Sequence, residues 1–294
     1  MLLRSDYRVT LTGEWDGTDC DVMIALHARR SAASIAAFAA ASPFAPLIVV
    51  LTGTDLYRDI HTDVSAQRSL QLATQLVVLQ PAGLQELDLN MRGKTQVIYQ
   101  SAPSLKPISH ELKHARYFDV IMIGHLRDEK DPETFMRAAI QLQSARVRLI
   151  HIGRALDPSL GALAEATQAA HPRYRWLGDM SHAATRQRLK RSHLMVVTSK
   201  MEGGANVIIE AITSGVPVLA SNISGNRGML GEDYIGYFPP GDSLQLAGMI
   251  DRAATDAEFY AQLQAQCAAR SHLFSTGLEK AAVLQLVHNC MIPQ

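Results

Sequence analysis

A glycine turn between an apolar run and an amphipathic segment constrains this chain most. Residues 194–198 predict a buried parallel strand and residues 207–212 predict a helix, so Gly203 and Gly204 lie where the strand passes into the helix. Glycine lets a ligand approach the backbone closely, and the unpaired N–H groups of a first helical turn favour an anion. We therefore expect a phosphate group to bind here. The amides that we expect to bind it belong to Gly204, Ala205, Asn206 and Val207.

Two glutamates flank this turn. Glu210 lies four residues beyond Asn206, about 6 Å further along the helix axis, so its carboxylate can accept hydrogen bonds from a diol attached to the phosphate. Glu202, on the loop, can do the same for a second hydroxylated group. A sugar nucleotide combines a ribose diol, a diphosphate and a hexose. The turn alone leaves a second interpretation open, in which it is an ordinary glycine turn with two solvated acids.

The order of apolar and amphipathic segments predicts an α/β protein with parallel sheets covered by helices on both faces. Residues 100–116 contain two prolines and no periodicity, which indicates a linker, and Asp242 is a candidate helix cap. The expected strands are residues 8–12, 21–26, 47–51, 76–79, 96–98, 118–123, 147–153, 173–178, 194–198 and 215–220. The expected helices are residues 31–41, 66–72, 83–91, 132–142, 207–212, 256–272 and 277–287.

The start of the chain departs from the usual doubly wound pattern. Such a sheet normally begins with a central strand, whereas residues 1–5 look like the end of a helix. We therefore expect the N-terminus to be incomplete by about one strand-helix unit. Loss of that strand would leave the apolar edge of its neighbour exposed.

Length and composition limit the classes of protein to which this chain can belong. At 294 residues with 47% apolar side chains, the chain is long enough for two α/β domains, and its 28 basic and 28 acidic residues give no global field for nucleic acid or membrane. Cys20, Cys267 and Cys290 form no C-x-x-C pair, which argues against a disulfide framework or zinc site. No signal peptide or membrane span is evident. We expect a cytoplasmic monomer or homodimer without nucleic-acid or membrane partners.

Two further groups of polar residues follow predicted strands, at the edge where parallel sheets bind ligands. Each group has a simpler interpretation, as solvated charges at the start of a helix or as a charged loop that caps one. Arg29 and Arg30 precede a helix and can form an anion site. The first group consists of His27, Arg29, Arg30, Thr54 and Asp55, and the second of Gly124, His125, Arg127, Lys130, Gly153 and Arg154.

Glu202 and Glu210, with seven residues between them, resemble the E-x7-E signature of retaining GT-B glycosyltransferases. This resemblance implies two Rossmann-like doubly wound domains that face each other across a cleft. Residues 1–102 would form the acceptor domain, residues 103–273 the UDP-sugar domain, and residues 274–294 a helix that crosses back toward the first domain. The resemblance assigns Glu202 to the donor hexose, the amides of residues 204–207 to hexose and diphosphate, and Glu210 to the ribose.

The same resemblance extends to the other loops. Residues 124–131 are similar to the family's G-R-L-x-x-E-K-G loop, in which Lys130 matches the lysine and His125 stands in place of the arginine. The second positive charge on the diphosphate would then come from Arg127 or from a protonated His125. Gly153 and Arg154 match the turn beneath the nucleotide, and His27 matches a histidine of the first domain. Thr52 stands where relatives commonly carry a histidine.

A narrower resemblance is to the selenosugar synthases of bacterial selenoneine biosynthesis. Residues 25–32, 51–60, 124–132 and 202–207 carry it. It implies transfer of a hexose, such as N-acetylglucosamine, from a UDP-sugar to selenophosphate. The acceptor would be a small anion, so the residues that would bind it are Arg29, Arg30, Thr54 and Asp55.

The chemistry of such a transfer suggests catalytic residues. A departing nucleotide gains negative charge as its bond to the hexose C1 breaks, and amides with Lys130 and Arg127 can stabilise that charge. His27 can orient the acceptor or relay a proton, so His27, Lys130 and Glu202 are the candidate catalytic residues. No D-x-D cluster is placed to hold a metal, and we expect neither a metal nor a cofactor.

Three alternatives remain open at this point. The chain can be a glycosyltransferase with another small acceptor, which would release UDP only with that acceptor. A GT-B-fold isomerase of UDP-sugars would release UDP without an acceptor-linked product. A non-catalytic nucleotide-sugar binding protein would bind UDP and show no turnover.

Overall fold

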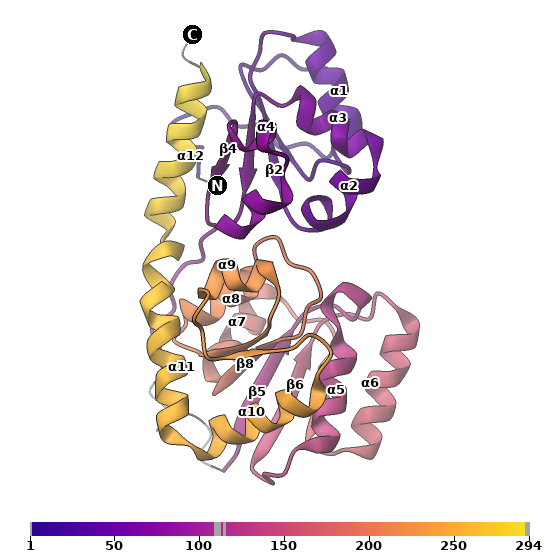
Figure 1. Cartoon of the computed structure of the whole chain (residues 1–294), viewed down its shortest axis with the longest axis vertical. Helices are drawn as coiled ribbons and strands as arrows, with labels where there is room; N and C mark the ends of the chain where they lie inside the picture. Colours follow the sequence, from indigo (N-terminus) through magenta and orange to yellow (C-terminus); the bar gives the residue numbers. More distant parts are fainter. Residues whose placement is uncertain (1, 109–112, 114–115, 292–294) are drawn as a thin grey trace. The chain divides into compact units, whose positions relative to one another are not determined.

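The computed structural model describes residues 2–108, 113 and 116–291, which fall into two compact units (Figure 1). The first unit takes the described residues of Met1–Ser101, Glu202–Gly204 and Leu273–Gln294. The second takes those of Ala102–Met201 and Ala205–His272. None of the described helices is long and apolar enough to cross a membrane.

The first unit is built on a four-stranded parallel sheet of order β1-β2-β3-β4. In the register, Met23 lies opposite Leu47 and Ile48 opposite Gln75. The central strand β2 is apolar throughout because helices cover both of its faces. The strands are β1 (Met23–Leu26), β2 (Leu47–Leu51), β3 (Gln75–Val78) and β4 (Thr95–Val97).

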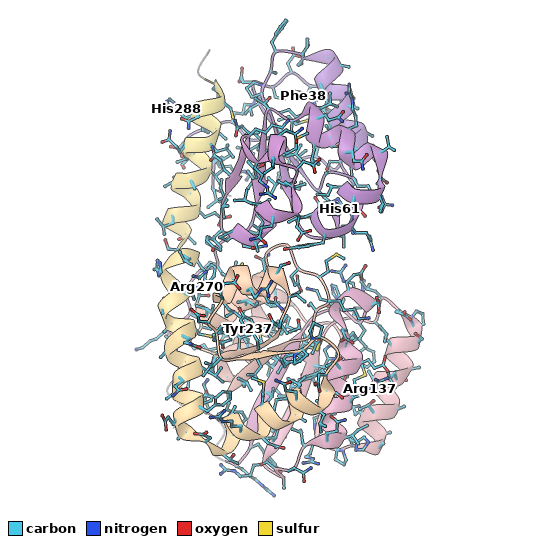
Figure 2. All side chains as sticks on the ribbon, in the orientation of Figure 1. Phe38, His61, Arg137, Tyr237, Arg270 and His288 are labelled. Carbon is cyan, nitrogen blue, oxygen red and sulfur yellow. The ribbon has the colours of Figure 1, made fainter. Side chains whose placement is uncertain are left out.

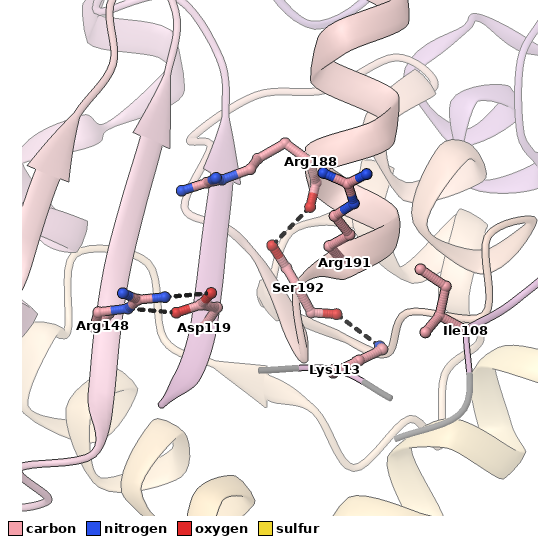
Figure 3. A pocket seen from close by; sticks show the side chains of 7 residues that line it. All are labelled: Ile108, Lys113, Asp119, Arg148, Arg188, Arg191 and Ser192. Carbon is pink, nitrogen blue, oxygen red and sulfur yellow. Dashed lines mark hydrogen bonds and ion pairs between the residues drawn. The ribbon is translucent and has the colours of Figure 1, made fainter. Parts of the chain in front are cut away.

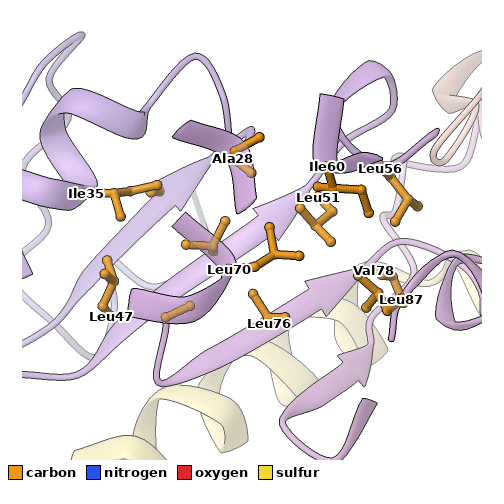
Figure 4. Close-up of a cluster of buried hydrophobic side chains, with 14 of the residues drawn as sticks. Ala28, Ile35, Leu47, Leu51, Leu56, Ile60, Leu70, Leu76, Val78 and Leu87 are labelled. Atoms are coloured by element: carbon orange, nitrogen blue, oxygen red, sulfur yellow. The ribbon is translucent and has the colours of Figure 1, made fainter. Parts of the chain in front are cut away.

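Helices cover the two faces of this sheet separately. On one face α1 (Ala32–Ala41) and α3 (Val64–Leu72) pack over a core that includes Phe38 and Leu76 (Figures 2 and 4). On the other face α12 (Thr276–Met291) packs Leu286 against the sheet. The Glu279 carboxylate accepts hydrogen bonds from the Ser101 N–H at 2.9 Å and its hydroxyl at 2.5 Å, which fixes α12 at the end of the sheet.

The second unit contains a six-stranded parallel sheet of order β10-β9-β8-β5-β6-β7. Helix α5 packs between α10 and α6, and α8 is contacted by α7 and α11. The strands are β5 (Phe118–Ile123), β6 (Val147–Ile152), β7 (Tyr174–Trp176), β8 (Leu194–Val197), β9 (Val218–Ser221) and β10 (Tyr237–Phe238). The helices are α5 (Pro132–Gln141), α6 (Pro158–Ala170), α7 (His182–Arg191), α8 (Asn206–Ile212), α9 (Ser224–Leu230), α10 (Ser243–Thr255) and α11 (Ala257–Arg270).

Polar side chains define where the helices begin. At several described helices, among them α3, α6, α7, α10 and α11, a side-chain oxygen accepts a hydrogen bond from a backbone N–H of the first turn, and each such cap stabilises a helix by about 1 kcal/mol. Asp242 caps α10 through the Gln245 N–H at 2.8 Å, which confirms the predicted cap. The other caps are Asp63 at α3, Asp157 at α6, Ser181 at α7 and Asp256 at α11.

The structure corrects the elements predicted at residues 8–12 and 83–91. Residues 8–12 form no strand, because no described strand pairs with them and Leu11 is exposed; the following segment instead packs Trp15 edge-on against Phe38, with ring centroids 5.5 Å apart. The helix predicted at 83–91 is interrupted at Leu87 and Asp88, whose backbones are extended. It consists of a 3-10 helix, η2 (Pro81–Glu86), and a short α4 (Leu89–Arg92).

The remaining segments are short or lie partly outside the residues that the structure describes. Residues 2–6 form turns closed by the Leu3 carbonyl, which accepts from the Asp6 and Tyr7 N–H groups, and are not the end of a helix. Met1 and six positions of the predicted linker at 100–116 lie outside the described residues. The other short elements are the π-helix η1 (Asp55–Asp59), α2 (Ile60–Thr62), and the 3-10 helices η4 (Asp128–Lys130) and η5 (Ser271–Phe274).

Candidate functional site

The predicted donor residues of the second unit gather at one edge of its sheet. Strands β8, β5 and β6 are adjacent and parallel, so the loops that follow them meet at their carboxyl ends. These loops carry Gly124 after β5, Gly153 after β6 and Ala205 after β8. Parallel sheets of this kind bind ligands at this edge.

The loops after β5 and β6 touch through their backbones at two glycines. A Cβ added to Gly153 would lie 1.9 Å from the Gly124 carbonyl oxygen, and Gly153 has a φ of +153°. The Gly153 N–H donates to the Gly178 carbonyl at 2.8 Å, and the Gly124 N–H donates to Ile152 at 2.9 Å. Residue 153 therefore has to be glycine for the two loops to approach this closely.

A buried histidine that sequence reasoning missed fixes the Gly124 carbonyl. His151 Nε2 lies 3.2 Å from that oxygen, and Nδ1 lies 2.9 Å from the Tyr174 hydroxyl. In the neutral imidazole, Nε2–H can donate to the carbonyl while Nδ1 accepts from the Tyr174 hydroxyl, so both ring nitrogens have partners without a charge on the ring. Burial lowers the pKa of His151 to about 4. The signal in the sequence was a single polar residue inside an otherwise apolar strand.

We expect His151 to make the protein less stable as the pH falls from about 6.5 to about 4. In this window the unfolded chain binds a proton at His151 that the folded chain cannot accept, because the pKa of the buried ring is lowered from 6.5 to about 4. The associated loss in the free energy of unfolding is on the order of 3 kcal/mol over the whole window. Urea unfolding at about pH 7 and about pH 5 should show a smaller pH dependence for His151→Gln than for the unaltered protein. Equal pH dependence in the two proteins would contradict this account.

The loop after β5 is also tied to the end of β8. The Thr198 hydroxyl donates to the Lys130 carbonyl at 2.7 Å, and the Lys200 N–H donates to the Glu129 carbonyl at 2.9 Å. The Lys200 ammonium pairs with Asp128 at 2.5 Å. The Lys130 stem runs beside Gly124, where an added Cβ would lie 3.6 Å from its Cδ. The lysine that the sequence singled out is thus held at the same edge as the glycines.

His125 and Arg127, the two candidates for the second positive charge, have different surroundings. His125 Nδ1 accepts a hydrogen bond from the Arg154 N–H at 3.1 Å. An imidazolium carries hydrogen on both nitrogens and cannot accept there, so this contact needs the neutral ring. Arg127 is partly exposed, and its Nε lies 4.0 Å from a Glu129 carboxylate oxygen. His125 therefore joins the loops after β5 and β6.

Helix α8 begins without a side-chain cap. Ala205 precedes it, and no described side chain accepts a hydrogen bond from its first turn. On the same helix, the Glu210 carboxylate lies 2.6 Å from His182 Nε2, a contact from α7 that sequence reasoning did not anticipate. The Glu210 side chain is 12% exposed, whereas the His182 side chain is 73% exposed.

Glu202, Gly203 and Gly204 group with the first unit, whereas Ala205 to Glu210 belong to the second. The Glu202 side chain is buried. The two glutamates of the signature therefore belong to different units. Among the described residues there is no group of three or more His, Cys, Asp or Glu side chains placed to hold a metal ion.

In the first unit, Asp55 joins the loops that follow β1 and β2. Its carboxylate is fully buried and accepts hydrogen bonds from the Ala28, Thr52 and Gly53 N–H groups at 2.8–2.9 Å. These contacts occupy both carboxylate oxygens, so the geometry gives Asp55 a positioning role for the loop that carries His27. The sequence predicted it as an acceptor-binding residue.

His27 lies beside a buried carboxylate oxygen that has no hydrogen-bond partner. The His27 backbone has a φ of +73°, and its Nδ1 accepts from the Arg30 N–H at 3.2 Å while Nε2 lies 3.0 Å from the Thr54 hydroxyl. The oxygen without a partner is Asp59 Oδ2, 3.9 Å from Nε2, on a residue that is 3% exposed. Asp59 was missed because its role depends on the turn of the π-helix η1.

The two predicted acceptor arginines differ. Arg29 is half exposed and pairs with Asp59 at 3.5 Å and Asp63 at 3.3 Å. Arg30 is exposed, and no carboxylate of a described residue pairs with it. Arg30 is therefore the better placed of the two to meet an anion, while Arg29 helps to compensate the charge of Asp59.

Comparison with known proteins identifies the family. Residues 108–270, more than half of the chain, match the family model of glycosyl transferases group 1. The chain belongs to this family. The glycine contact of Gly124 and Gly153, Lys130 and the α8 turn all lie within the matched region or its loops. The predicted class of enzyme, a glycosyltransferase, is confirmed.

Solved structures confirm the predicted GT-B fold. The Anabaena protein Alr3699/HepE in complex with UDP and glucose has a TM-score of 0.75 at 21% identity, covering 91% of this chain and 77% of that one. Sucrose-phosphate synthase from Thermosynechococcus elongatus has a TM-score of 0.74 at 19% identity, covering 92% and 73%. The pneumococcal O-GlcNAc transferase GtfA in complex with UDP and GlcNAc has a TM-score of 0.71 at 16% identity, covering 92% and 57%.

A curated relative matches only a short stretch. Protein CapJ of Staphylococcus aureus is 36% identical over 66 residues, which make up 22% of this chain and 16% of CapJ. The matched part of this chain thus spans about a sixth of that relative's length.

Proposed function

We propose that this group 1 glycosyltransferase transfers a hexose from a UDP-sugar to a small anionic acceptor. The observation that carries the donor half is the meeting of the β5, β6 and β8 loops around Gly124, Gly153 and Lys130. The structurally similar HepE was solved with UDP and glucose, and GtfA with UDP and GlcNAc, which supports a UDP-sugar donor.

The donor diphosphate would lie against the uncapped N-terminal turn of α8 and the ammonium group of Lys130. Its negative charge increases as the bond to the hexose C1 breaks, so fixed amides and a fixed ammonium stabilise the transition state more than the bound substrate. Arg127 would supply a further charge. Because the Thr198 hydroxyl and the Lys200 backbone N–H hold the loop that carries Lys130, little rearrangement is needed during the reaction.

The ribose would bind Glu210, and the hexose would bind Glu202. The contact of Glu210 Oε1 with His182 fixes the orientation of the carboxylate and leaves Oε2 for a diol, which supports the first assignment. The assignment of Glu202 rests on the resemblance of the E-x7-E spacing. We assign the UDP-sugar to residues 103–273 and the acceptor to residues 1–102, and α12 (Thr276–Met291) lies in the segment predicted to return to the first domain.

We further propose selenophosphate as the acceptor and N-acetylglucosamine as the hexose. The narrower resemblance supports both, and the exposed Arg30 guanidinium supports an anion. A selenolate is already a strong nucleophile, so His27 would orient the acceptor more than deprotonate it. In this transfer a lone pair of selenium forms the bond to C1, and the C1–oxygen bond breaks with its electron pair leaving on UDP.

Incubation of the protein with UDP-N-acetylglucosamine tests this proposal directly. One reaction contains selenophosphate and others contain hydroxyl acceptors, and mass spectrometry follows the products. We expect UDP and a seleno-linked sugar only in the first reaction, with Arg30→Gln raising the acceptor KM about tenfold. Release of UDP only with a hydroxyl acceptor would leave the family assignment intact and overturn the anionic acceptor.

Calorimetry with UDP and UDP-sugar tests the two glutamates separately. We expect Glu210→Ala to weaken UDP itself, and Glu202→Ala to spare UDP but weaken the intact UDP-sugar. Each loss should be about 1–3 kcal/mol, since each substitution leaves a ligand hydroxyl without its partner. Glu165→Ala, at an exposed position of α6, is the control and should change neither affinity. Equal effects of Glu202→Ala on both ligands would contradict the assignment of Glu202 to the hexose.

A further inference from the structure

A buried chain of hydrogen bonds joins the ends of β8 and β9 to helix α9. The Ser221 hydroxyl, at the end of β9, donates to the Ser199 carbonyl at 2.5 Å. The Asn226 side-chain amide, in α9, donates to the carbonyl and the hydroxyl oxygen of Ser221 at 2.9 and 3.0 Å. Each of the three residues is at most 1% exposed. They lie at the carboxyl end of the sheet, where the donor loops begin.

These side chains take over where the backbone ladder between β8 and β9 ends. The two strands are parallel, with Val197 opposite Ala220. In this register the next backbone donor for the Ser199 carbonyl would be the Ile223 N–H. That N–H donates instead to the Ser221 carbonyl at 2.9 Å, because the chain turns there into α9. The Ser221 hydroxyl therefore replaces the missing backbone donor and extends the pairing of the two strands by one step.

Helix α9, which carries Asn226, is held at its far end. The Arg270 guanidinium donates to the Gly228 and Met229 carbonyls at 3.1 and 3.0 Å. These contacts satisfy carbonyl groups that the last turn of a helix leaves without intrahelical partners. The amide of Asn226 is thus presented by a fixed helix. Since it donates to the hydroxyl oxygen of Ser221, the hydrogen of that hydroxyl is left for the neighbouring strand.

The path continues from Ser199 to the lysine of the donor site. Ser199 follows Thr198, whose buried hydroxyl donates to the Lys130 carbonyl at 2.7 Å. A fixed Ser199 carbonyl holds the backbone beside Thr198, and Thr198 in turn holds the backbone from which the Lys130 side chain begins. All of these residues belong to the second unit. The hydrogen bonds therefore form a continuous path from α9 to Lys130.

Closure of the sheet alone offers a simpler explanation, because buried polar groups need partners wherever they lie. The same sheet has such a tie at its other end, where Arg148 of β6 donates two hydrogen bonds of 2.7 and 2.8 Å to Asp119 of β5 (Figure 3). That tie lies at the amino ends of the strands, away from the donor loops. Asn226, by contrast, is kept at a cost, since its Oδ1 atom is buried without a hydrogen-bond partner.

We propose that Ser221 and Asn226 are positioning residues for Lys130, which keep its ammonium group in place for the donor diphosphate. This role rests on the diphosphate site proposed above. Neither residue touches the ligand, and both act through the backbone of the segment that follows β8. A charge stabilises a departing group best when its position is fixed before the reaction. Loosening of this segment should therefore weaken UDP binding through Lys130.

A double-mutant cycle with UDP as the ligand tests this path. Calorimetry on the whole chain compares the effect of Ser221→Ala in otherwise unaltered protein with its effect in Lys130→Gln protein. We expect Ser221→Ala to weaken UDP about tenfold in the first case and less than about threefold in the second, where the lysine charge is already gone. Asn226→Asp should act like Ser221→Ala, because a carboxylate has no N–H to donate and draws the Ser221 hydroxyl hydrogen away from Ser199.

Ser214→Ala is the matched control. Ser214 is buried as well, but its hydroxyl has no hydrogen-bond partner, so its removal should leave UDP binding unchanged in both proteins. Arg148→Gln controls for a loss of stability, since it breaks the tie at the other end of the sheet. It should lower the melting temperature and leave the affinity for UDP unchanged. Circular dichroism checks that each variant is folded.

Unchanged UDP affinity in Ser221→Ala, or an equally large loss with and without Lys130→Gln, would overturn the role of Ser221 and Asn226 while the donor site stands. Equal losses in Ser221→Ala and Ser214→Ala would overturn it in the same way. Absence of UDP binding in the unaltered protein would overturn the donor site and this role together.

Discussion

Gly153→Ala should lower kcat/KM for the UDP-sugar by at least about a hundredfold and destabilise the fold by about 1–3 kcal/mol. The new methyl group would lie 1.9 Å from the Gly124 carbonyl oxygen, a contact with backbone that side-chain rotation cannot relieve. The φ of +153° adds strain of its own for any residue with a Cβ. Both loops would therefore move apart, and the groups that they carry would leave their positions.

Gly248→Ala is the control for this substitution. Gly248 lies within α10, and an added Cβ would meet nothing within 4 Å. Alanine favours a helix over glycine by about 0.5–1 kcal/mol, so this variant should be as stable as the original protein or slightly more stable. Steady-state kinetics and urea unfolding on both variants make the comparison. Full activity of Gly153→Ala would show that the contact of the two loops is not needed for the reaction.

Much of the fold was predictable because parallel strands buried on both faces are continuous apolar runs. Residues 47–51 and 118–123 coincide with β2 and β5 for this reason. The strand predicted at 8–12 was wrong because alternation of apolar and polar residues indicates a strand only if a partner strand supplies hydrogen bonds. Local pattern carries no information on that partner.

The residues of the candidate site also fall into those that the sequence predicts and those that it does not. Gly153 and Lys130 were predictable from their position after strands and from the family's spacing. His151, His182 and Asp59 were not, since each acts through a contact with a distant segment: His151 with Gly124, His182 with Glu210, and Asp59 with His27. A buried or paired polar residue looks like any other polar residue until the fold places its partner beside it.

The ion pairs of Arg29 show why residue type alone is a weak guide to charge. Two adjacent arginines at a helix start predict a strong anion site, but Asp59 and Asp63 accept ion pairs from Arg29. The net charge that an acceptor meets there is therefore smaller than the sequence indicates. We accordingly expect Arg30 to contribute more to acceptor binding than Arg29.

Lys130→Gln should lower kcat/KM for the UDP-sugar by about a hundredfold to a thousandfold, with a loss in kcat as well as in affinity. The ammonium compensates a charge that grows on the departing diphosphate, so its contribution is larger in the transition state than in the bound substrate. Glutamine is shorter by one atom of chain and keeps a hydrogen-bond donor, so the loss reports the charge more than the packing beside Gly124.

Lys200→Gln is the matched control for that charge. Lys200 lies after β8 and its ammonium forms a half-exposed ion pair with Asp128, which is worth no more than about 1 kcal/mol. Its substitution should change kcat/KM by less than about threefold, even though it removes the same charge from a neighbouring loop. Steady-state kinetics at saturating acceptor separate the two cases. Equal losses in both variants would mean that the general positive field of this sheet edge, rather than a fixed ammonium at Lys130, stabilises the departing nucleotide.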